Sequence, residues 1–428
     1  MNRLLLFIVF VLNICEAYAQ RSNLTDRLME NAITFKIEDD TLDRTGHDYF
    51  SEIFKRNRVV VLGEYHGSKR ISELVESIIP IYAENGGKSL LLEIGPYTAY
   101  FLNQHIRLGT DMESYLAKVN SKYKFDSDDF QHGPIPFLYY RSDAAFLSEA
   151  IENRLEIIGL DQEFLFGYQF LLDEAFSSLS DDDKVTYEGD FTRLRDTITY
   201  FYEVEKESYK LEGAKRRRFS ILFRESDFVQ RSLLSLASID SNLLSVIENL
   251  QSSNDIYYYQ NVGNWWVSNK LRTTNFIDNF VKFLNSSHNK EKLLIKIGGL
   301  HAAKGINGYN MYDIGNTLYE YARLNKGESI HIVFMNRFET DDEGQVTDVL
   351  SDTTSWFTKN FHTAIHRRKH SSLRQLPLRS TKTFKNDAQA AARQTYAIST
   401  GLSPQWTNQP ARSSIGYAGQ TNGVSEQT

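Results

Sequence analysis

The amino-acid sequence predicts an α/β protein: a mainly parallel sheet flanked by helices, with a large all-helical insertion that caps the carboxyl edge of the strands. Three observations support this fold class. Short apolar runs that fit buried strands alternate with segments of helical period. The apolar runs end in polar residues, where parallel strands face a ligand crevice. Residues 163–260 interrupt the alternation with helical segments alone.

The N-terminal segment, residues 1–19, has the pattern of a secretory signal peptide. Arg3 supplies the positive charge, an apolar run follows, and Ala17 and Ala19 stand at the cleavage positions, so the mature chain is expected to begin at Gln20. The apolar run is too short for a comfortable membrane span. We therefore expect an exported protein, periplasmic or secreted, with no stable membrane span after cleavage.

The composition excludes several classes of chemistry. Cys15 is the only cysteine and lies inside the expected signal peptide, so the mature chain has no disulfide, thiol nucleophile or thiolate metal ligand. The net charge of −7 over 428 residues gives no reason to expect a nucleic-acid partner. With 41% hydrophobic residues, the chain can bury a large core.

The first predicted strand, residues 58–63, runs straight into a polar turn that contains Glu64 and His66. A helix with one apolar face follows at 71–83, with Ser68 as its expected N-cap. Residues two apart in extended chain point the same way, so Glu64 and His66 are expected to project together near the crevice. An acid beside an imidazole suits a general base or a metal site.

The second and third predicted strands, at 89–94 and 155–160, repeat this arrangement. Glu93 lies at the end of the second strand, and Asp161 follows the third directly. The short strand–helix–strand connection implies that the first two strands are parallel, which places Glu93 at the same edge as Glu64. The remaining segments are expected to be helices at 96–107 and 142–152 and an irregular stretch at 108–142.

Residues 163–260 are charged and carry apolar residues at helical spacing, which predicts several helices and no strand. Such an insertion in an α/β chain commonly covers the crevice. The basic run Lys215–Arg218 fits the solvated face of one of these helices.

The α/β pattern then returns. An aromatic cluster that ends in Trp265 and Trp266 precedes a helix over 267–284, and a strand follows at 292–297. Glycines after this strand allow the backbone to approach a ligand closely. A fifth strand at 329–334 completes the sheet. The polar residues expected near the crevice from this part are Arg272, Asn279, His301 and Lys304.

These boundaries divide the chain into five parts. They are the signal peptide (1–19), the first part of the α/β domain (20–162), the helical insertion (163–260), the second part of the α/β domain (261–365) and a tail (366–428). The tail has nine Lys and Arg residues against Asp387 and Glu426, and its polar composition predicts a disordered basic segment.

The motifs at the strand ends, taken in order, resemble the erythromycin esterase family, within the wider group that includes the ChaN haem-binding lipoproteins and the Tiki proteases. They are Leu62–Lys69, Leu91–Glu93, Ile158–Asp161, Arg272 with Phe276 and Asn279, and Gly298–Lys304. The resemblance covers roughly residues 50–340. In this chain a single residue, Tyr65, separates Glu64 from His66, a spacing closer to that of the ChaN group.

The resemblance implies roles for particular residues. His66 matches the general base that activates water, and Glu64 matches the acid beside it. Glu93, Arg272 and His301 match the other polar residues that converge on the cleft. Contacts with a small-molecule substrate are expected from Asp161, Tyr65, Asn279 and Lys304.

The residue types alone support similar chemistry. A neutral His66 can take a proton from water while a carboxylate on its other nitrogen sets the tautomer. Arg272 can stabilise an oxyanion or hold an anionic substrate group, and His301 can act as a second acid or base. No serine stands in a Gly-x-Ser-x-Gly motif, which argues against a serine esterase. We therefore expect an ester-cleaving hydrolase without a covalent intermediate and without a cofactor.

Three alternatives remain open at this stage. Two histidines and two glutamates also suit a Zn or Mn ion in a metal-dependent hydrolase or peptidase, although no metal ligand is assigned. A ChaN-like protein would instead bind haem or another small ligand, with Tyr65 facing an apolar slot. An interaction protein would expose an aromatic patch, for which Trp265 and Trp266 are the candidates. The sequence does not indicate an oligomeric state.

Overall fold

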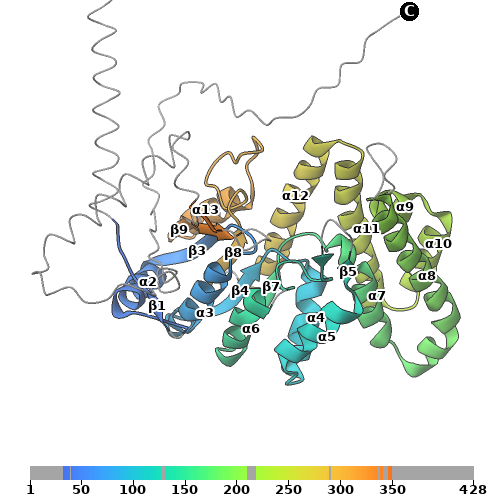
Figure 1. Ribbon diagram of the computed structural model, residues 1–428, viewed down its shortest axis with the longest axis horizontal. Helices are drawn as coiled ribbons and strands as arrows, with labels where there is room; N and C mark the ends of the chain where they lie inside the picture. Colours follow the sequence, from blue (N-terminus) through green and yellow to red (C-terminus); the bar gives the residue numbers. More distant parts are fainter. Residues whose placement is uncertain are drawn as a thin grey trace, which may run out of the picture.

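The computed structural model (Figure 1) describes most of the chain between residues 32 and 348. The described ranges are 32–38, 40–126, 131–139, 141–209, 218–288, 291–334, 338–340 and 346–348. The expected signal peptide, Cys15, residues 215–217 of the basic run and the tail at 366–428 lie outside them.

The centre of the molecule is a five-stranded sheet in the order β7-β4-β8-β3-β9. Every pairing in it is parallel, as the sequence predicts. All five strands overlap the predicted apolar runs. Their bounds are β3 Asn57–Glu64, β4 Gly87–Leu92, β7 Glu156–Gly159, β8 Lys292–Gly298 and β9 Glu328–Val333. Within the described ranges, three two-stranded antiparallel pairs lie outside this sheet: β1 Ile37–Glu38 with β2 Thr41–Leu42, β5 Phe125–Asp126 with β6 Gln131–His132, and β10 Phe338–Thr340 with β11 Val346–Asp348.

Four helices near the sheet match the helices predicted at 71–83, 96–107, 142–152 and 267–284, and the helices Arg44–Arg56 and Ile314–Leu324 are additional. Each of them has apolar residues at helical spacing. Gly86, whose φ is +88°, lies just after the end of the helix Lys69–Glu84. Their bounds are α2 Arg44–Arg56, α3 Lys69–Glu84, α4 Pro96–Arg107, α6 Arg141–Glu152, α12 Trp265–Phe283 and α13 Ile314–Leu324.

Both faces of the sheet are covered, because successive strand residues point to opposite sides. Val60 and Leu62 of β3 belong to one core, which includes the apolar face of α3. Val59 and Val61 belong to a second core, to which α12 and α13 contribute. Burial on both faces explains why the three central strands, β4, β8 and β3, are nearly continuous apolar runs rather than alternating ones.

The prediction of an irregular stretch at 108–142 was wrong for its first half, where α5 spans Met112–Lys122. Asp111 caps this helix by accepting a hydrogen bond from the Ser114 N–H. Its buried side chains follow the helical repeat: Met112, Tyr115, Leu116 and Val119. The local signal was present, but it was obscured by the polar residues around it.

The described part of the insertion contains helices and no strand, as expected. Its elements are η1 Leu165–Gly167, α7 Tyr168–Ser177, α8 Asp181–Ser208, α9 Phe219–Glu225, α10 Asp227–Ala237 and α11 Ser241–Asn261. Figure 1 shows these helices beside the sheet, beyond its β7 side. The last of them, α11, packs against α12 and reaches the carboxyl end of the strands through Ser253 and Tyr257.

Within the described ranges, no helix combines the length and the apolar composition needed to cross a membrane.

Candidate active site

Four strands bring acidic or basic residues to the carboxyl edge of the sheet. Glu64 is the last residue of β3, Glu93 follows β4, and Asp161 and His301 lie just beyond β7 and β8. Backbone hydrogen bonds continue past the strand ends: Gly299 donates to the Glu64 carbonyl at 2.9 Å, and Asp161 donates to the Ile94 carbonyl at 2.9 Å. The parallel register therefore fixes these residues near one another.

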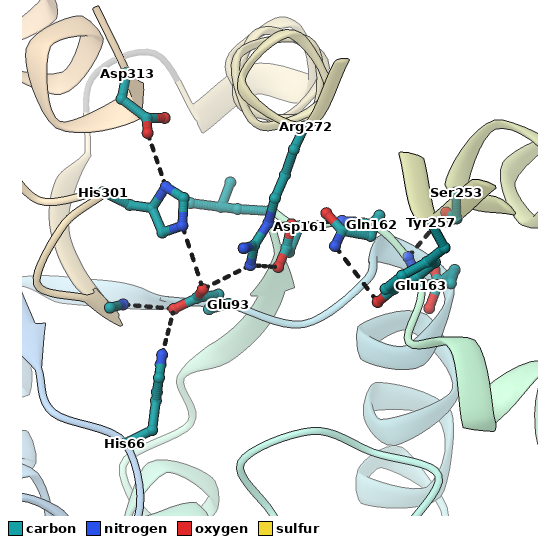
Figure 2. Close-up of polar contacts among 12 residues, drawn as sticks. His66, Glu93, Asp161, Gln162, Glu163, Ser253, Tyr257, Arg272, His301 and Asp313 are labelled. Atoms are coloured by element: carbon teal, nitrogen blue, oxygen red, sulfur yellow. Dashed lines mark hydrogen bonds and ion pairs between the residues drawn. The ribbon is translucent and has the colours of Figure 1, made fainter. Parts of the chain in front are cut away.

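Glu93 lies at the centre of the cluster and is only 3% exposed (Figure 2). Its Oε1 accepts a hydrogen bond from Arg272 Nη2 at 2.8 Å, and its Oε2 accepts one from the Gly298 N–H at 2.5 Å. Two imidazoles face the same carboxylate. His66 Nε2 lies 3.6 Å from Oε2, and His301 Nε2 lies 3.9 Å from Oε1.

His66 is the most open of these side chains, with 38% of it exposed. Its Nδ1 lies 3.1 Å from Glu64 Oε1. Its ring stacks on Phe137, with centroids 3.9 Å apart and an angle of 11° between the planes. An ionised carboxylate only accepts hydrogen bonds, so Glu64 favours the tautomer with the proton on Nδ1 and leaves a lone pair on Nε2.

Glu64 is buried and is paired with a second buried residue, Lys296, whose Nζ lies 2.6 Å from Oε2. Burial alone acts to raise the pKa of Glu64, but the charge of Lys296 and the contact with His66 outweigh it and hold that pKa below its ordinary value. Glu64 is therefore ionised at neutral pH. Sequence reasoning missed Lys296, because it lies inside the apolar run of β8.

Arg272 joins Glu93 to Asp161. Its Nε lies 3.0 Å from Asp161 Oδ1 and its Nη2 lies 2.5 Å from Oδ2, a two-point contact. Burial acts to lower the pKa of Arg272, but the charges of Asp161 and Glu93 raise it above its ordinary value. Among the residues that the structure describes, Nη1 has no hydrogen-bond partner, so this edge of the guanidinium can still donate to a ligand.

His301 is held from behind by Asp313, with 2.7 Å between Nδ1 and Oδ2. Asp313 is fully buried and also accepts hydrogen bonds from Asn307 Nδ2 and from the Ile314 N–H, each at 2.7 Å. The sequence shows Asp313 only as an ordinary N-cap of α13. Its contact with a histidine 12 residues earlier was not predictable from that pattern.

Three of the residues expected to contact the substrate lie at the margin of this cluster or outside it. Tyr65 is 57% exposed beside His66. Asn279 is buried and donates to the Leu160 carbonyl at 3.0 Å and to the Asp161 carbonyl at 3.3 Å, so it supports the loop after β7. Lys304 Nζ donates to the Ser329 carbonyl at 2.9 Å. The fourth, Asp161, touches Arg272 and is 4% exposed.

A further acid, Glu163, was not identified from the sequence. It is fully buried, its N–H donates to Ser253 Oγ of α11 at 2.9 Å, and its carboxylate accepts from the Tyr97 N–H at 2.6 Å and from the Thr98 hydroxyl at 2.6 Å. Burial raises the pKa of Glu163 to about 7, against the opposing effect of these hydrogen bonds. Glu163 thereby ties the loop after β7 to the start of α4.

The donor set bears on the metal and haem alternatives. Among the described residues, no three His, Cys, Asp or Glu side chains are grouped so as to hold a metal ion. Glu64 and Glu93 are each already paired with a cation, Lys296 and Arg272. A cavity of about 10 Å³ beside Glu64, Glu93 and Phe137 has the size of one water molecule. Binding of Zn, Mn or haem stays a prediction from the sequence.

No protein-family model and no curated protein matches the sequence. Three solved structures are similar in fold. A histidine-to-asparagine mutant of an erythromycin esterase, in its open conformation, is 15% identical over 74% of this chain and 82% of that one, with a TM-score of 0.43. A protein from Bacillus cereus is 13% identical over 80% and 83%, with a TM-score of 0.43. A succinoglycan biosynthesis protein is 15% identical over 76% and 79%, with a TM-score of 0.45. These are similarities of fold.

Proposed function

We propose that the protein is a hydrolase that cleaves an ester or lactone bond with water activated by His66. The observation that carries this proposal is the pair of His66 and Glu64. Its Nδ1–Oε1 distance is 3.1 Å, and the His66 side chain is 38% exposed. A buried carboxylate behind an accessible imidazole is the arrangement that a general base requires.

The positions of the groups support the following reaction. His66 Nε2 takes a proton from water, and the resulting hydroxide attacks the carbonyl carbon of the substrate. Arg272 Nη1 donates to the developing oxyanion. The bond between carbon and the leaving oxygen then breaks. The proton that His66 took from water is passed by His301, which Asp313 orients, to that oxygen, so that both histidines end the cycle as they began it. One water is consumed, and no covalent intermediate with the protein is formed.

The charge of the site favours a substrate that is neutral at the reacting bond. Its four carboxylates are Glu64, Glu93, Asp161 and Asp313, whereas its permanent cations are Lys296 and Arg272. An anionic group at the same place would meet an excess of negative charge. Exposed apolar side chains lie next to the two histidines: Tyr65 is 57% exposed, Leu300 is 53% exposed, and Tyr309 is 42% exposed with its ring centroid 6.3 Å from that of His301. We infer a small molecule with an apolar part next to the bond.

The test is hydrolysis of a panel of esters, lactones and amides by the purified mature protein. Wild type is compared with His66→Ala and with His47→Ala, a matched control whose side chain is 51% exposed on α2. We expect His66→Ala to lose at least about 100-fold in kcat while His47→Ala keeps full activity. Full activity in His66→Ala contradicts the proposal.

Repeating the assay in the presence of a chelator separates this proposal from metal-dependent hydrolysis or peptidase activity of the Tiki type. Activity that survives the chelator in wild type supports activation by His66 alone. Activity that is lost with chelator and restored by Mn or Zn assigns the protein to the metallohydrolases instead. Haem titration of the same sample, followed by its Soret absorbance, tests for a ChaN-like ligand-binding protein.

We also propose that the protein is exported through its N-terminal segment. The support is compositional: Arg3, the apolar run after it, and the small residues Ala17 and Ala19. N-terminal sequencing of the protein recovered from a periplasmic or culture fraction is expected to begin at Gln20. Recovery of the intact N-terminus from the cytoplasm contradicts this.

A further inference from the structure

Lys296 is an unusual residue for its place in the sheet. It lies near the end of β8, a central strand, with Leu62 of β3 and Leu92 of β4 as its register partners on either side. Its side chain is 5% exposed. A lysine is rarely buried to this extent unless a carboxylate compensates its charge, because removing an ammonium group from water is costly.

The compensating group is Glu64, and it connects Lys296 to His66. Lys296 Nζ lies 2.6 Å from Glu64 Oε2, and the other oxygen, Oε1, lies 3.1 Å from His66 Nδ1. The ammonium also faces the ring of Phe146, with 5.4 Å between Nζ and the centroid. The cavity of about 10 Å³ beside these groups has room for one water, which can accept a further hydrogen bond from Nζ.

The protonation state of Glu64 decides which nitrogen of His66 carries the proton. An ionised Glu64 accepts a hydrogen bond, so His66 must donate from Nδ1 and keeps its lone pair on Nε2. A neutral Glu64 would donate its O–H to Nδ1, and the ring proton would move to Nε2. The imidazole would then have no basic nitrogen on its Nε2 side, which faces Glu93.

Burial acts to raise the pKa of Glu64, and Lys296 is the strongest of the influences that lower it. Without that ammonium, a carboxyl group that is 8% exposed would tend to its neutral form.

We propose that Lys296 is a positioning residue: by pairing with Glu64 it keeps His66 in the tautomer whose Nε2 accepts a proton from water. This inference rests on the proposed function for its catalytic consequence, but the tautomer itself can be measured without a substrate. Lys296 does not touch the reacting atoms and acts through Glu64.

The test is a double-mutant cycle of Lys296→Met and Glu64→Gln. Lys296→Met leaves Glu64 neutral, so kcat is expected to fall about 100-fold. The kcat of Glu64→Gln is expected to fall by a similar factor, because Lys296 attracts the amide oxygen and turns the NH₂ group toward His66 Nδ1. In the double variant the amide is free to turn its oxygen to Nδ1–H, so kcat is expected to recover at least tenfold over either single variant.

The second readout is the ¹⁵N NMR spectrum of the His66 ring, assigned by comparison with His66→Ala. The proton is expected on Nδ1 in wild type and in the double variant, and on Nε2 in both single variants. Lys292→Met is the matched control, because Lys292 lies on the same strand and donates to the Phe54 carbonyl, away from His66. It is expected to keep the wild-type tautomer and kcat.

The outcomes separate the two proposals. A Lys296→Met protein with the wild-type tautomer and kcat overturns the role of Lys296, whether or not His66 is the base. Full activity in His66→Ala overturns the proposed function, while the NMR result still decides the role of Lys296. If Lys296→Met does not fold, Glu64→Gln and the double variant carry the test, and a double variant whose kcat does not exceed that of Glu64→Gln contradicts the proposal.

Discussion

At the scale of single residues, Glu93 is held from four sides. Arg272 and the Gly298 N–H occupy its two oxygens, and two imidazoles face it at 3.6 Å and 3.9 Å (Figure 2). A carboxylate with both oxygens bonded cannot rotate to follow either histidine. His66 and His301 are therefore separated by a fixed negative charge, which stabilises whichever of them carries an extra proton during a reaction.

Phe137 keeps His66 in place from the side. The backbone φ of Phe137 is +61°, in the left-handed region that residues other than glycine and asparagine rarely adopt. Backbone strain of this kind persists where the surrounding structure requires it and is concentrated at functional sites. Here the strained residue places its ring flat against the candidate base.

Substitution of Gly298 tests whether the position of His66 matters for activity. A Cβ at Gly298 would lie 2.9 Å from His66 Nε2 and 3.2 Å from Glu93 Oε2. We expect Gly298→Ala to displace the imidazole and lower kcat by roughly 10- to 100-fold, since small misplacements of catalytic groups are costly. Steady-state kinetics on the substrate found in the panel measure this loss.

The neighbouring glycine supplies the control. A Cβ at Gly299 would have its nearest contact, with Val333, at an ordinary 3.5 Å. Gly299→Ala is therefore expected to keep kcat within about twofold of wild type. Equal losses in the two variants would show that the effect is general to this turn and not specific to His66.

At the scale of elements, α12 links the site to one core of the sheet. Phe276, Phe280 and Phe283 of this helix are buried in the same core as Val59 and Val61. Arg272, one turn before Phe276, contacts the carboxylates of Asp161 and Glu93. The Arg272 guanidinium also lies over the Phe276 ring, 5.5 Å from its centroid. Because three buried aromatic side chains fix this helix, they also fix the position of the Arg272 guanidinium.

Asn279 on the same helix is expected to support the fold without binding substrate. Its amide donates to two carbonyls of the loop after β7. We expect Asn279→Ala to lower the free energy of unfolding by about 1–3 kcal/mol, because a buried acceptor loses its partner. Urea unfolding measures this loss. The substrate KM is expected to stay within about twofold, and a large rise in KM would restore the role assigned from the sequence.

Glu163 makes the stability of the fold depend on pH, because its pKa changes on folding. Its contacts join the loop after β7 to α4 and α11. Its pKa rises from an ordinary 4.5 to about 7 on folding, so the folded state binds more protons than the unfolded state between these values. Its contribution is therefore fully present below about pH 4.5 and is lost as the pH rises through 7. The loss amounts to roughly 3 kcal/mol at most.

Urea unfolding of wild type and Glu163→Gln at several pH values between 4.5 and 8 tests this. Glutamine stays neutral and cannot titrate. We expect the free energy of unfolding of wild type to fall, relative to that of Glu163→Gln, as the pH rises across this window. A difference that stays constant, or that grows in favour of wild type, contradicts the assignment.

All five sheet strands were predictable from their apolar residues, which are nearly continuous in β3, β4 and β8 because those strands are buried on both faces. Glu93 was predictable because it follows such a run directly, and His301 because it follows the glycines after one. Lys296 and Asp313 were not, because one is a charge inside a strand and the other an ordinary helix cap. Their roles depend on partners far along the chain, which no local pattern reveals.

At the scale of the whole molecule, the insertion shares a core with the sheet. A single hydrophobic cluster extends from Val60 and Leu294 in the strands through α3 and α4 to Phe170 and Leu250 in the insertion. Since apolar contact is continuous between the two parts, we expect them to unfold together. The insertion thus stabilises the strands that carry the site.

Leu250→Ala tests this continuity. Leu250 is fully buried in α11, so its truncation is expected to cost about 2–5 kcal/mol. If the parts are one cooperative unit, urea unfolding followed by circular dichroism and by loss of hydrolytic activity gives coincident curves, both shifted to lower urea. Activity that persists after most of the helical signal is lost would show that the insertion unfolds independently.

The site is assembled from segments that are remote in sequence: the Gly298 N–H and the Glu93 carboxylate that it contacts are 205 residues apart. No contiguous stretch of the chain contains a working set of these groups. A nascent polypeptide or a proteolytic fragment lacks part of this set. For the hydrolase proposed above, completion of folding is therefore the step that assembles the active site.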